Sequence, residues 1–386
     1  MNSSRGYALD AIAAALVAAF CAGCGVNPDK EFAAGAEAFA AGDYAKAASR
    51  YRKGLEERPG DIDALVMLAR AELAAGEIAS AKETLSKAAA TNGEDPDILE
   101  LAAQASFYDR DCKQAYAIYS RLANNASLPD EVRASGWAGM GVIDFFLVDK
   151  SPENPELRDR ARTELIRATQ LDRRNVPARY HLARLYRDSF GFLEAAREQF
   201  DYFTHLETGN DPRVAKVLRE TIPAIREELA KKAASRPGAA RRNSVACTEA
   251  LAKADAHYRR KDWKAARAAY ADALAKDAFS YPAAIGLARS WENSGRTRNE
   301  LKEALYAYRK ACDLSPSAVQ AFISAGEVAM KLGNYATAVQ LYSRAMAANP
   351  ANTTVVDGLI RALVKSGSRK SAAVYQHYRD TLPKRK

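Results

Sequence analysis

The sequence predicts an all-α fold built from about nine helical hairpins. Alanine dominates the hydrophobic residues, which make up 48% of the 386 residues, whereas Gly (21) and Pro (14) are sparse. Such a composition favours helices, because alanine loses the least side-chain entropy on entering one. A second observation is an internal period: Ala47, Ala81 and Ala115 follow one another at intervals of 34 residues. A repeat of this length corresponds to one pair of helices that packs against identical neighbours.

The first 23 residues are expected to be a signal peptide rather than part of the fold. Arg5 precedes an apolar run over residues 11–20 that is too short to span a bilayer as a helix. The small residues directly before Cys24 resemble the lipobox of bacterial lipoproteins, which implies cleavage before Cys24 and attachment of lipid to its thiol. Cys21 stands where that pattern usually has Leu, so secretion without lipidation and a cytoplasmic chain with a buried first helix are the alternatives.

The register of the repeat follows from small residues that let two helices approach closely. The anchors of the nine hairpins are Ala47, Ala81, Ala115, Ala161, Ala196, Ala266, Ala304, Ala338 and Ala372. Large residues follow four positions later at Tyr51, Leu85, Tyr119, Leu165, Phe200, Tyr270, Tyr308 and Tyr342, and the turn glycines are Gly42, Gly76, Gly295, Gly333 and Gly367. This pattern resembles the tetratricopeptide repeat (TPR), which implies that the hairpins stack into a superhelical solenoid.

Two interruptions divide the predicted array. Residues 148–159 carry two prolines and are expected to form an exposed loop. Residues 211–232 are expected to form an extra helix, and residues 233–246 a flexible linker rich in Pro, Gly and basic residues. The predicted domains are therefore an N-terminal TPR segment over residues 28–232, with five repeats and the extra helix, and a C-terminal TPR segment over residues 247–386, with four repeats.

Stacked hairpins bury their apolar faces and leave a long concave groove. The resemblance implies that the first helix of each hairpin lines it, through Phe39, Arg70, Gln104, Phe107, Phe145, Tyr180, Arg184, Arg187, Tyr258, Arg289 and Arg361. Aromatic and arginine side chains are enriched at binding hot spots, so the groove is expected to hold an extended or helical protein segment that carries acidic groups. For single residues the alternatives are packing between hairpins for Phe107, Phe145 and Tyr258, and pairing with a carboxylate for Arg70 and Arg361.

The formal net charge of +9 favours anionic partners without selecting among them. Helical repeats that read RNA carry a base-reading pair of side chains at fixed positions, and the corresponding positions vary here from Phe32 and Ala36 to Asp357 and Arg361. No nucleic-acid partner is therefore expected.

The sequence gives no sign of catalytic or metal chemistry. Its four histidines, His181, His205, His257 and His377, are far apart and form no HExxH pair, and the cysteines Cys112, Cys247 and Cys312 form no CxxC motif. Phosphate-binding and nucleophile-elbow motifs are missing as well. We therefore expect no enzyme activity, no cofactor, no metal and no small-molecule substrate.

The expected function is a protein-binding adaptor or assembly scaffold of the bacterial cell envelope, anchored to the membrane through lipid on Cys24 and facing the periplasm. In this it resembles the TPR lipoproteins that serve pilus and secretion assembly, outer-membrane assembly or polysaccharide export. The alternative is a cytoplasmic TPR adaptor or chaperone-like regulator. The sequence does not select the partner protein or the pathway.

Overall fold

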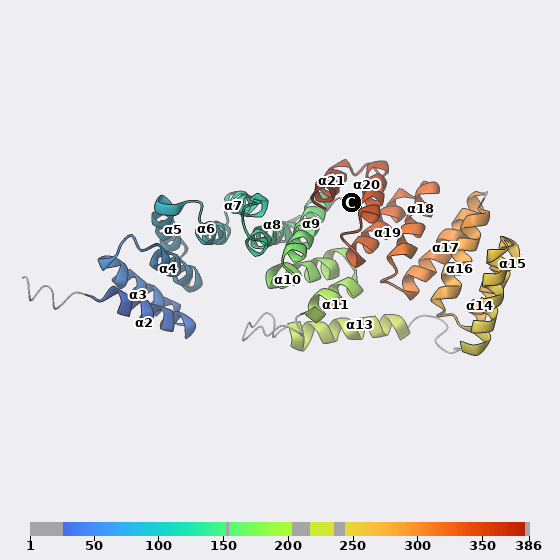
Figure 1. Ribbon diagram of the computed structural model, residues 1–386, viewed down its shortest axis with the longest axis horizontal. Helices are drawn as coiled ribbons and strands as arrows, with labels where there is room; N and C mark the ends of the chain where they lie inside the picture. The colour runs from blue at the N-terminus through green and yellow to red at the C-terminus, as the bar shows by residue number, and fades with distance from the viewer. Residues whose placement is uncertain (1–25, 152–153, 203–216, 235–243, 296, 383–386) are drawn as a thin grey trace, which may run out of the picture. The chain divides into compact units, whose positions relative to one another are not determined.

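The computed structural model describes residues 26–151, 154–202, 217–234, 244–295 and 297–382 (Figure 1). Within these ranges the chain forms 19 α-helices and no β-strand, which confirms the all-α prediction. Eighteen of the helices pair as the nine predicted hairpins, and α13 is the extra helix. The predicted signal peptide and Cys24 lie outside the described residues, as do residues 211–216 of the predicted extra helix and most of the predicted linker.

The first five hairpins are α2 (Pro28–Ala40) with α3 (Tyr44–Glu57), α4 (Ile62–Ala75) with α5 (Ile78–Asn92), α6 (Pro96–Tyr108) with α7 (Cys112–Asn124), α8 (Asp130–Lys150) with α9 (Pro155–Leu171), and α10 (Val176–Leu185) with α11 (Leu193–Asp201). A short π-helix, η1 (Tyr186–Phe190), extends α10. A second one, η3 (Val217–Thr221), leads into α13 (Ile222–Ala234).

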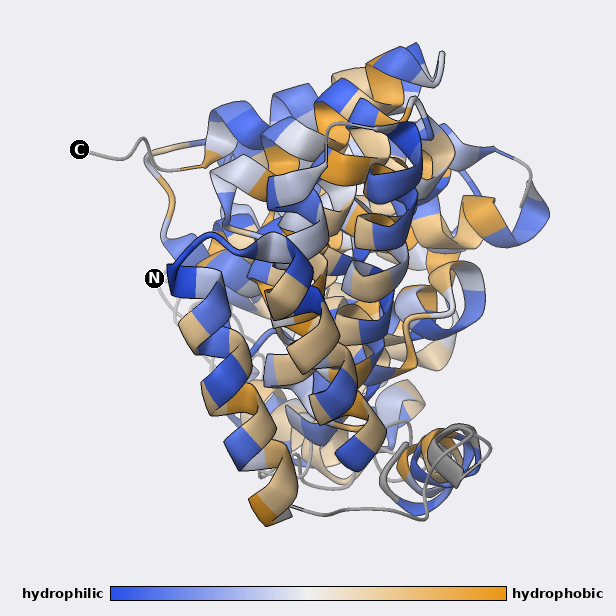
Figure 2. Cartoon of the chain, turned by 90° about the vertical axis from the view of Figure 1, so that its right-hand side faces the viewer, coloured by the Kyte–Doolittle hydropathy of each residue, from blue (hydrophilic) through white to orange (hydrophobic). Residues whose placement is uncertain are grey.

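The last four hairpins are α14 (Ser244–Arg259) with α15 (Trp263–Lys276), α16 (Tyr281–Ser294) with α17 (Arg298–Leu314), α18 (Val319–Lys331) with α19 (Tyr335–Ala348), and α20 (Thr353–Lys365) with α21 (Arg369–Thr381). Hydrophilic and hydrophobic residues alternate around most of these helices (Figure 2). Such helices cannot bury their apolar side alone, so each hairpin depends on its neighbours.

Short polar side chains begin many of the helices. In α6, for example, Asp95 Oδ1 accepts a hydrogen bond from the backbone N–H of Asp97 at 2.9 Å, which satisfies one of the donors that a helix start leaves unpaired. The predicted turn glycines adopt positive φ angles at Gly42, Gly76, Gly333 and Gly367, whereas Gly295 has a φ of −64°. Arg110 and Lys261 adopt the same left-handed conformation in the α6–α7 and α14–α15 turns without being glycine.

The predicted register is confirmed by burial. All nine anchor alanines lie in the second helix of a hairpin and are buried, with at most 4% of the side chain exposed, and the eight large residues that follow them are buried too. Four of the rings pack into space that glycines leave open: for example, a Cβ added to Gly326 would lie 2.7 Å from the Tyr342 ring, and one added to Gly286 would lie 2.3 Å from the Tyr270 ring. The small residues are therefore required by close packing between helices.

Contacts among α-carbons divide the chain into two compact units, Met1–Met140 and Gly141–Lys386, and the division falls within α8. It does not coincide with the expected boundary at residues 233–246. Since residues 235–243 lie outside the described part of the chain, the predicted domain ranges stay a prediction.

Within the second unit, the last helix returns to pack on an early one: α21 lies against α9 (Figure 1). Arg162 of α9 is fully buried there, with its guanidinium 4.7 Å from the centroid of Phe190 and 5.1 Å from that of Tyr375, and with Nη2 3.2 Å from Met346 Sδ. The Tyr375 hydroxyl donates to Asp159 Oδ1 at 2.7 Å. Hairpins that are far apart in the sequence are thus joined by buried polar contacts.

The predicted loop at residues 148–159 is wrong in extent. Helix α8 continues to Lys150 and α9 begins at Pro155, because Asn154 caps α9 and a proline is tolerated in the first helical turn. Val148 and Asp159, at the ends of the predicted loop, are both buried. Of the described residues, only Ser151 and Asn154 lie between the two helices.

Replacement of Gly136 is expected to push α7 and α8 apart. A Cβ at this position would lie 2.6 Å from the backbone nitrogen of Ala123 and 2.8 Å from the carbonyl oxygen of Tyr119, and backbone atoms cannot rotate away. Gly136→Ala should lower the free energy of unfolding by about 1–3 kcal/mol, measured as a lower urea midpoint. Gly60→Ala is the control, since nothing lies within 4 Å of its added Cβ. Equal midpoints for the two variants would contradict the packing described here.

The contact between α9 and α21 is expected to depend on the Tyr375 hydroxyl. Tyr375→Phe leaves the buried Asp159 carboxylate without its donor, so it should cost about 1–3 kcal/mol and speed amide hydrogen exchange in α21. Tyr306→Phe, at a tyrosine that is 73% exposed, is the matched control and should change neither quantity. Unchanged exchange in α21 of the Tyr375 variant would show that this hydrogen bond does not hold the helix.

Candidate functional site

The first helices of the first three hairpins line a pocket of about 420 Å³ in the N-terminal unit, which we call the first-helix pocket. Its lining residues are Phe39 of α2, Arg70, Leu73 and Ala74 of α4, and Asp97, Glu100, Leu101, Gln104 and Tyr108 of α6. Three predicted groove residues, Phe39, Arg70 and Gln104, are therefore brought together. Pockets that hold small ligands typically have volumes of roughly 300–1,000 Å³.

The charges in the first-helix pocket are mixed. Arg70 Nη2 lies 3.1 Å from Asp97 Oδ2, so the predicted arginine is already paired with a carboxylate. Glu100, one helical turn further along α6, has only the Gln104 side-chain amide as a weak donor, at 3.4 Å. Burial raises the pKa of the Glu100 carboxyl and the negative charge of Asp97 raises it further, whereas the charge of Arg70 and the hydrogen bond from Gln104 offset only part of this rise. The pocket thus contains a carboxylate whose charge is poorly compensated.

Phe107, on the same helix, is half-buried and lies 6.2 Å, centroid to centroid, from the ring of Tyr108. Tyr108 itself is 55% exposed, whereas Phe39 is half-buried and meets Tyr44 edge to face at 5.2 Å. The pocket therefore offers one open ring, that of Tyr108, and one partly covered ring, that of Phe39.

In the second unit, several predicted groove residues form an aromatic cluster. Phe145 is buried, with 1% exposed, and does not line an open surface. Its centroid lies 5.0 Å from that of His181, which in turn lies 5.2 Å from that of Tyr180. The Arg184 guanidinium lies 4.8 Å from the Phe145 centroid. These residues pack α8 against α10, which is the alternative that the sequence left open for Phe145.

Arg184 and Arg187 both lie beside one carboxylate. Arg187 Nε donates to Asp188 Oδ1 at 2.5 Å, and Arg184 Nε lies 3.7 Å from Asp188 Oδ2. The hydrogen bond to Asp188 raises the pKa of the Arg187 guanidinium. The two positive charges are therefore partly neutralised where an acidic partner segment was expected to bind.

In the last four hairpins, two acidic residues of first helices pair with a basic residue of the next first helix. Arg361 Nη2 donates to Glu327 Oε1 at 2.7 Å, and Lys331 Nζ donates to Glu292 Oε1 at 2.9 Å. Both carboxylates also accept a hydrogen bond from a tyrosine hydroxyl of the same hairpin, Tyr342 and Tyr308 respectively. Each of these acids thus has a cation and a hydroxyl donor.

The remaining predicted residues, Tyr258 and Arg289, lie on neighbouring first helices. The Tyr258 hydroxyl accepts a hydrogen bond from Asn293 Nδ2 at 2.8 Å, and its ring meets that of Trp263 at 5.2 Å. Arg289 is exposed and forms no ion pair with the described residues. Of the five predicted arginines, it alone lacks such a carboxylate within the described part of the chain.

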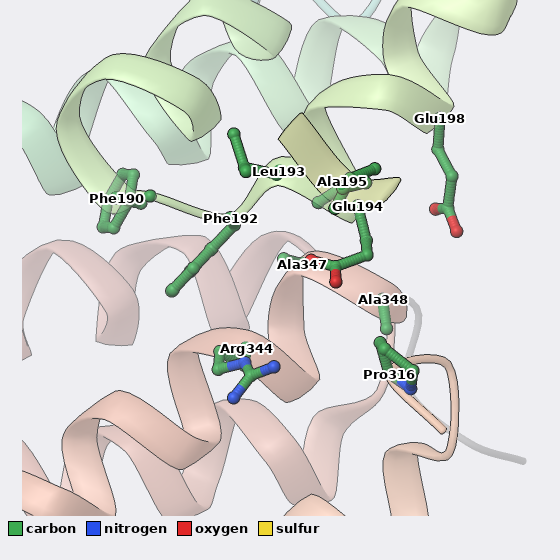
Figure 3. Close-up of a pocket in the computed structure, with 12 residues that line it drawn as sticks. Phe190, Phe192, Leu193, Glu194, Ala195, Glu198, Pro316, Arg344, Ala347 and Ala348 are labelled. Carbon is green, nitrogen blue, oxygen red and sulfur yellow. The ribbon is translucent and has the colours of Figure 1, made fainter. Parts of the chain in front are cut away.

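A second pocket, of about 310 Å³, lies in the C-terminal unit between the segment 190–198 and α19 (Figure 3). Phe192 and Glu194 point toward the side of the pocket that Arg344 and Ala347 form (Figure 3). Arg344 also lies 3.5 Å from Asp313, and Glu198 adds a second carboxylate to the lining. Because acidic, basic and aromatic groups are mixed here, this pocket indicates no single class of ligand.

The described residues contain no group of three or more His, Cys, Asp or Glu side chains arranged to hold a metal ion. Cys247 and Cys312 are buried and Cys112 is partly exposed, and none of the three is in a disulfide. Burial raises the pKa of the Cys312 thiol to about 12. Among the described residues, no helix combines the length and the apolar character that a membrane span requires.

Sequence reasoning missed the acidic side of the first-helix pocket. It selected aromatic residues, arginines and Gln104, whereas the lining also contains the acids Asp97 and Glu100. Glu100 stands four residues before the selected Gln104, so both lie on one face of α6. This spacing of four residues was the signal in the sequence that could have identified Glu100 as a pocket residue.

Two protein families match parts of the chain. Residues 38–105 match the family described as "Tetratricopeptide repeat", and residues 238–385 match the family described as "Bacterial transcriptional activator domain". The comparison with curated proteins gives no match.

Several solved structures resemble the chain. One is titled "Functional Characterization of Pseudomonas Aeruginosa pilF" (20% identity over 54% of this chain and 93% of that chain, TM-score 0.39). Another is the "APC/C hetero-tetramer Cut9-Hcn1" (17% identity over 92% of this chain and 79% of that chain, TM-score 0.35). A third is the "TPR2AB-domain:pHSP90-complex of yeast Sti1" (17% identity over 92% and 98%, TM-score 0.26).

The family match over residues 38–105 covers α3 to α5 together with most of α6 and the end of α2, and the same pairing of helices recurs along the described residues. This match and this hairpin architecture confirm the resemblance to the tetratricopeptide repeat that the sequence predicted.

Proposed function

We propose that this chain is an adaptor that holds a segment of a partner protein along the first helices of its hairpins. The observation that carries the proposal is the first-helix pocket, which α2, α4 and α6 line together. A pocket shared by three repeats suits a segment that runs from one hairpin to the next, as in other groove-type recognition of peptides. A scaffold of this kind needs no catalytic group, and we propose none.

We further propose that the adaptor works in the bacterial cell envelope, anchored by lipid on Cys24. The support comes from the sequence alone: an apolar run over residues 11–20 and small residues directly before the cysteine. Lipid on the N-terminal cysteine would leave the hairpins that follow it on the periplasmic side. Pilus, secretion, outer-membrane and polysaccharide-export assembly are the candidate pathways.

A second candidate function is that of a regulator in the cytoplasm. Residues 238–385, which contain the last four hairpins, match the bacterial transcriptional activator domain. This match favours a regulatory role, because the family is named for proteins that activate transcription. In this case residues 1–23 would be retained and the partner would be a component of a regulatory complex.

Position-resolved crosslinking tests whether the first helices hold the partner. With photoreactive p-benzoylphenylalanine at Gln104 or Arg289, irradiated cells should give discrete protein adducts, because both side chains lie on first helices. The same group at Glu57, exposed on the second helix α3, should give little. Adducts that form equally from Glu57, or only from there, would place the partner on another surface.

Lipid labelling separates the envelope adaptor from the cytoplasmic regulator. Cells that express the chain should incorporate radioactive palmitate into it, and Cys24→Ala should abolish the label while the protein still accumulates. Cys112→Ala, at a free cysteine outside the proposed lipobox, is the control and should leave the label unchanged. A wild-type chain that carries no label and stays in the cytoplasmic fraction would exclude the anchor and favour the regulator.

A further inference from the structure

The first-helix pocket contains a partly buried acidic group, Glu100, whose surroundings differ from those of two acids on later first helices. Glu292 and Glu327, on later first helices, each lie within hydrogen-bonding distance of a cation, Lys331 at 2.9 Å and Arg361 at 2.7 Å. Glu100 forms no ion pair with the described residues, and its single donor is the Gln104 amide at 3.4 Å. A carboxylate that loses water on burial and has no cation within ion-pair distance is only partly compensated, here by the more distant charge of Arg70, so a ligand that supplies a cation is favoured.

The net charge of the pocket is negative, as is the charge of Glu100. Its charged lining residues are Arg70, Asp97 and Glu100, which sum to one negative charge, and the only base is already engaged by Asp97 at 3.1 Å. An acidic partner group would meet two carboxylates and would have to break that ion pair. An acidic segment, as expected from the sequence, is therefore disfavoured in this pocket.

The uncharged walls suit a long basic side chain. Leu73, Ala74 and Leu101 provide an apolar surface for a chain of methylene groups, and the open ring of Tyr108 provides a face for a cation, with the half-buried Phe39 beside it. A metal ion is a poorer fit, because Ca²⁺ and Mg²⁺ require about six oxygen ligands and the pocket offers the carboxylates of Asp97 and Glu100, of which Asp97 is already paired with Arg70.

We propose that the first-helix pocket binds a lysine or arginine side chain of the partner's segment, with the cationic group against Glu100 and the aliphatic part along Leu73 and Leu101. This inference rests on the proposed adaptor function and specifies its partner. The occupant is a protein segment rather than a small cation, because the lining comes from three successive hairpins and extends beyond the space that one side chain fills.

A double-mutant cycle tests the pairing directly. Phage-displayed random peptides of about 12 residues are selected on the full chain, and the best one is synthesised with its basic residue intact or replaced by norleucine, which keeps the methylene chain and removes the charge. Dissociation constants for both peptides are then measured by fluorescence anisotropy against the wild type and Glu100→Gln. Glu57→Gln, an exposed acid on α3, is the matched control.

The selected peptides should share one Lys or Arg at a fixed position. The wild type and Glu57→Gln should bind the basic peptide about tenfold more tightly than its norleucine analogue, and Glu100→Gln should lose that preference. Selected peptides without a basic residue, or a preference that survives Glu100→Gln, would overturn the assignment while leaving peptide binding intact. If no peptide is enriched at all, the adaptor function itself fails.

Discussion

Close approach between the two helices of a hairpin, and between neighbouring hairpins, is the constraint on which this fold depends. Four tyrosine rings on second helices pack against a glycine of a facing helix, and the ring of Tyr342 packs against two, Gly326 and Gly358. The ring fills the space, its hydroxyl reaches the acid Glu327, and burial together with that acid raises the pKa of the Tyr342 hydroxyl. The tyrosine therefore does two things: its ring packs the helices together, and its hydroxyl orients an acidic side chain on the first helix.

The consequence for function is that first-helix side chains are held in rows by the packing beneath them. In the C-terminal unit two acids of these rows, Glu292 and Glu327, each accept a hydrogen bond from a tyrosine hydroxyl and from a basic residue of the following hairpin, so their charges are compensated within the protein. In the N-terminal unit one carboxylate, Glu100, is left with a weak amide donor. A carboxylate that already has a cation and a hydroxyl donor stabilises the fold, whereas a carboxylate with only a weak donor, such as Glu100, can accept a cationic group of a ligand.

Much of the fold could be predicted from the sequence, because periodic small residues report directly on helix packing. The nine anchor alanines are all buried in second helices, and the extra helix α13 was expected from residues 211–232. The loop at residues 148–159 was predicted too long, since two prolines were taken as a loop signal while Asn154 and Pro155 start a helix. The packing of α21 on α9 was not predictable, because buried contacts such as that between Tyr375 and Asp159 join residues more than 200 positions apart.

The candidate site was predictable in part. Position within the repeat located Phe39, Arg70 and Gln104 on one pocket, but it could not tell which charges would be compensated, since ion pairs such as that between Arg70 and Asp97 depend on neighbouring hairpins. For the same reason Phe145, selected for the groove, is instead buried among aromatic rings.

The most direct test of the central claim is a crystal structure of the full chain with a selected peptide bound. The account predicts that the peptide lies along α2, α4 and α6, with a basic side chain against Glu100. A peptide bound on second helices such as α3 and α5, or one that leaves the first-helix pocket empty, would contradict it.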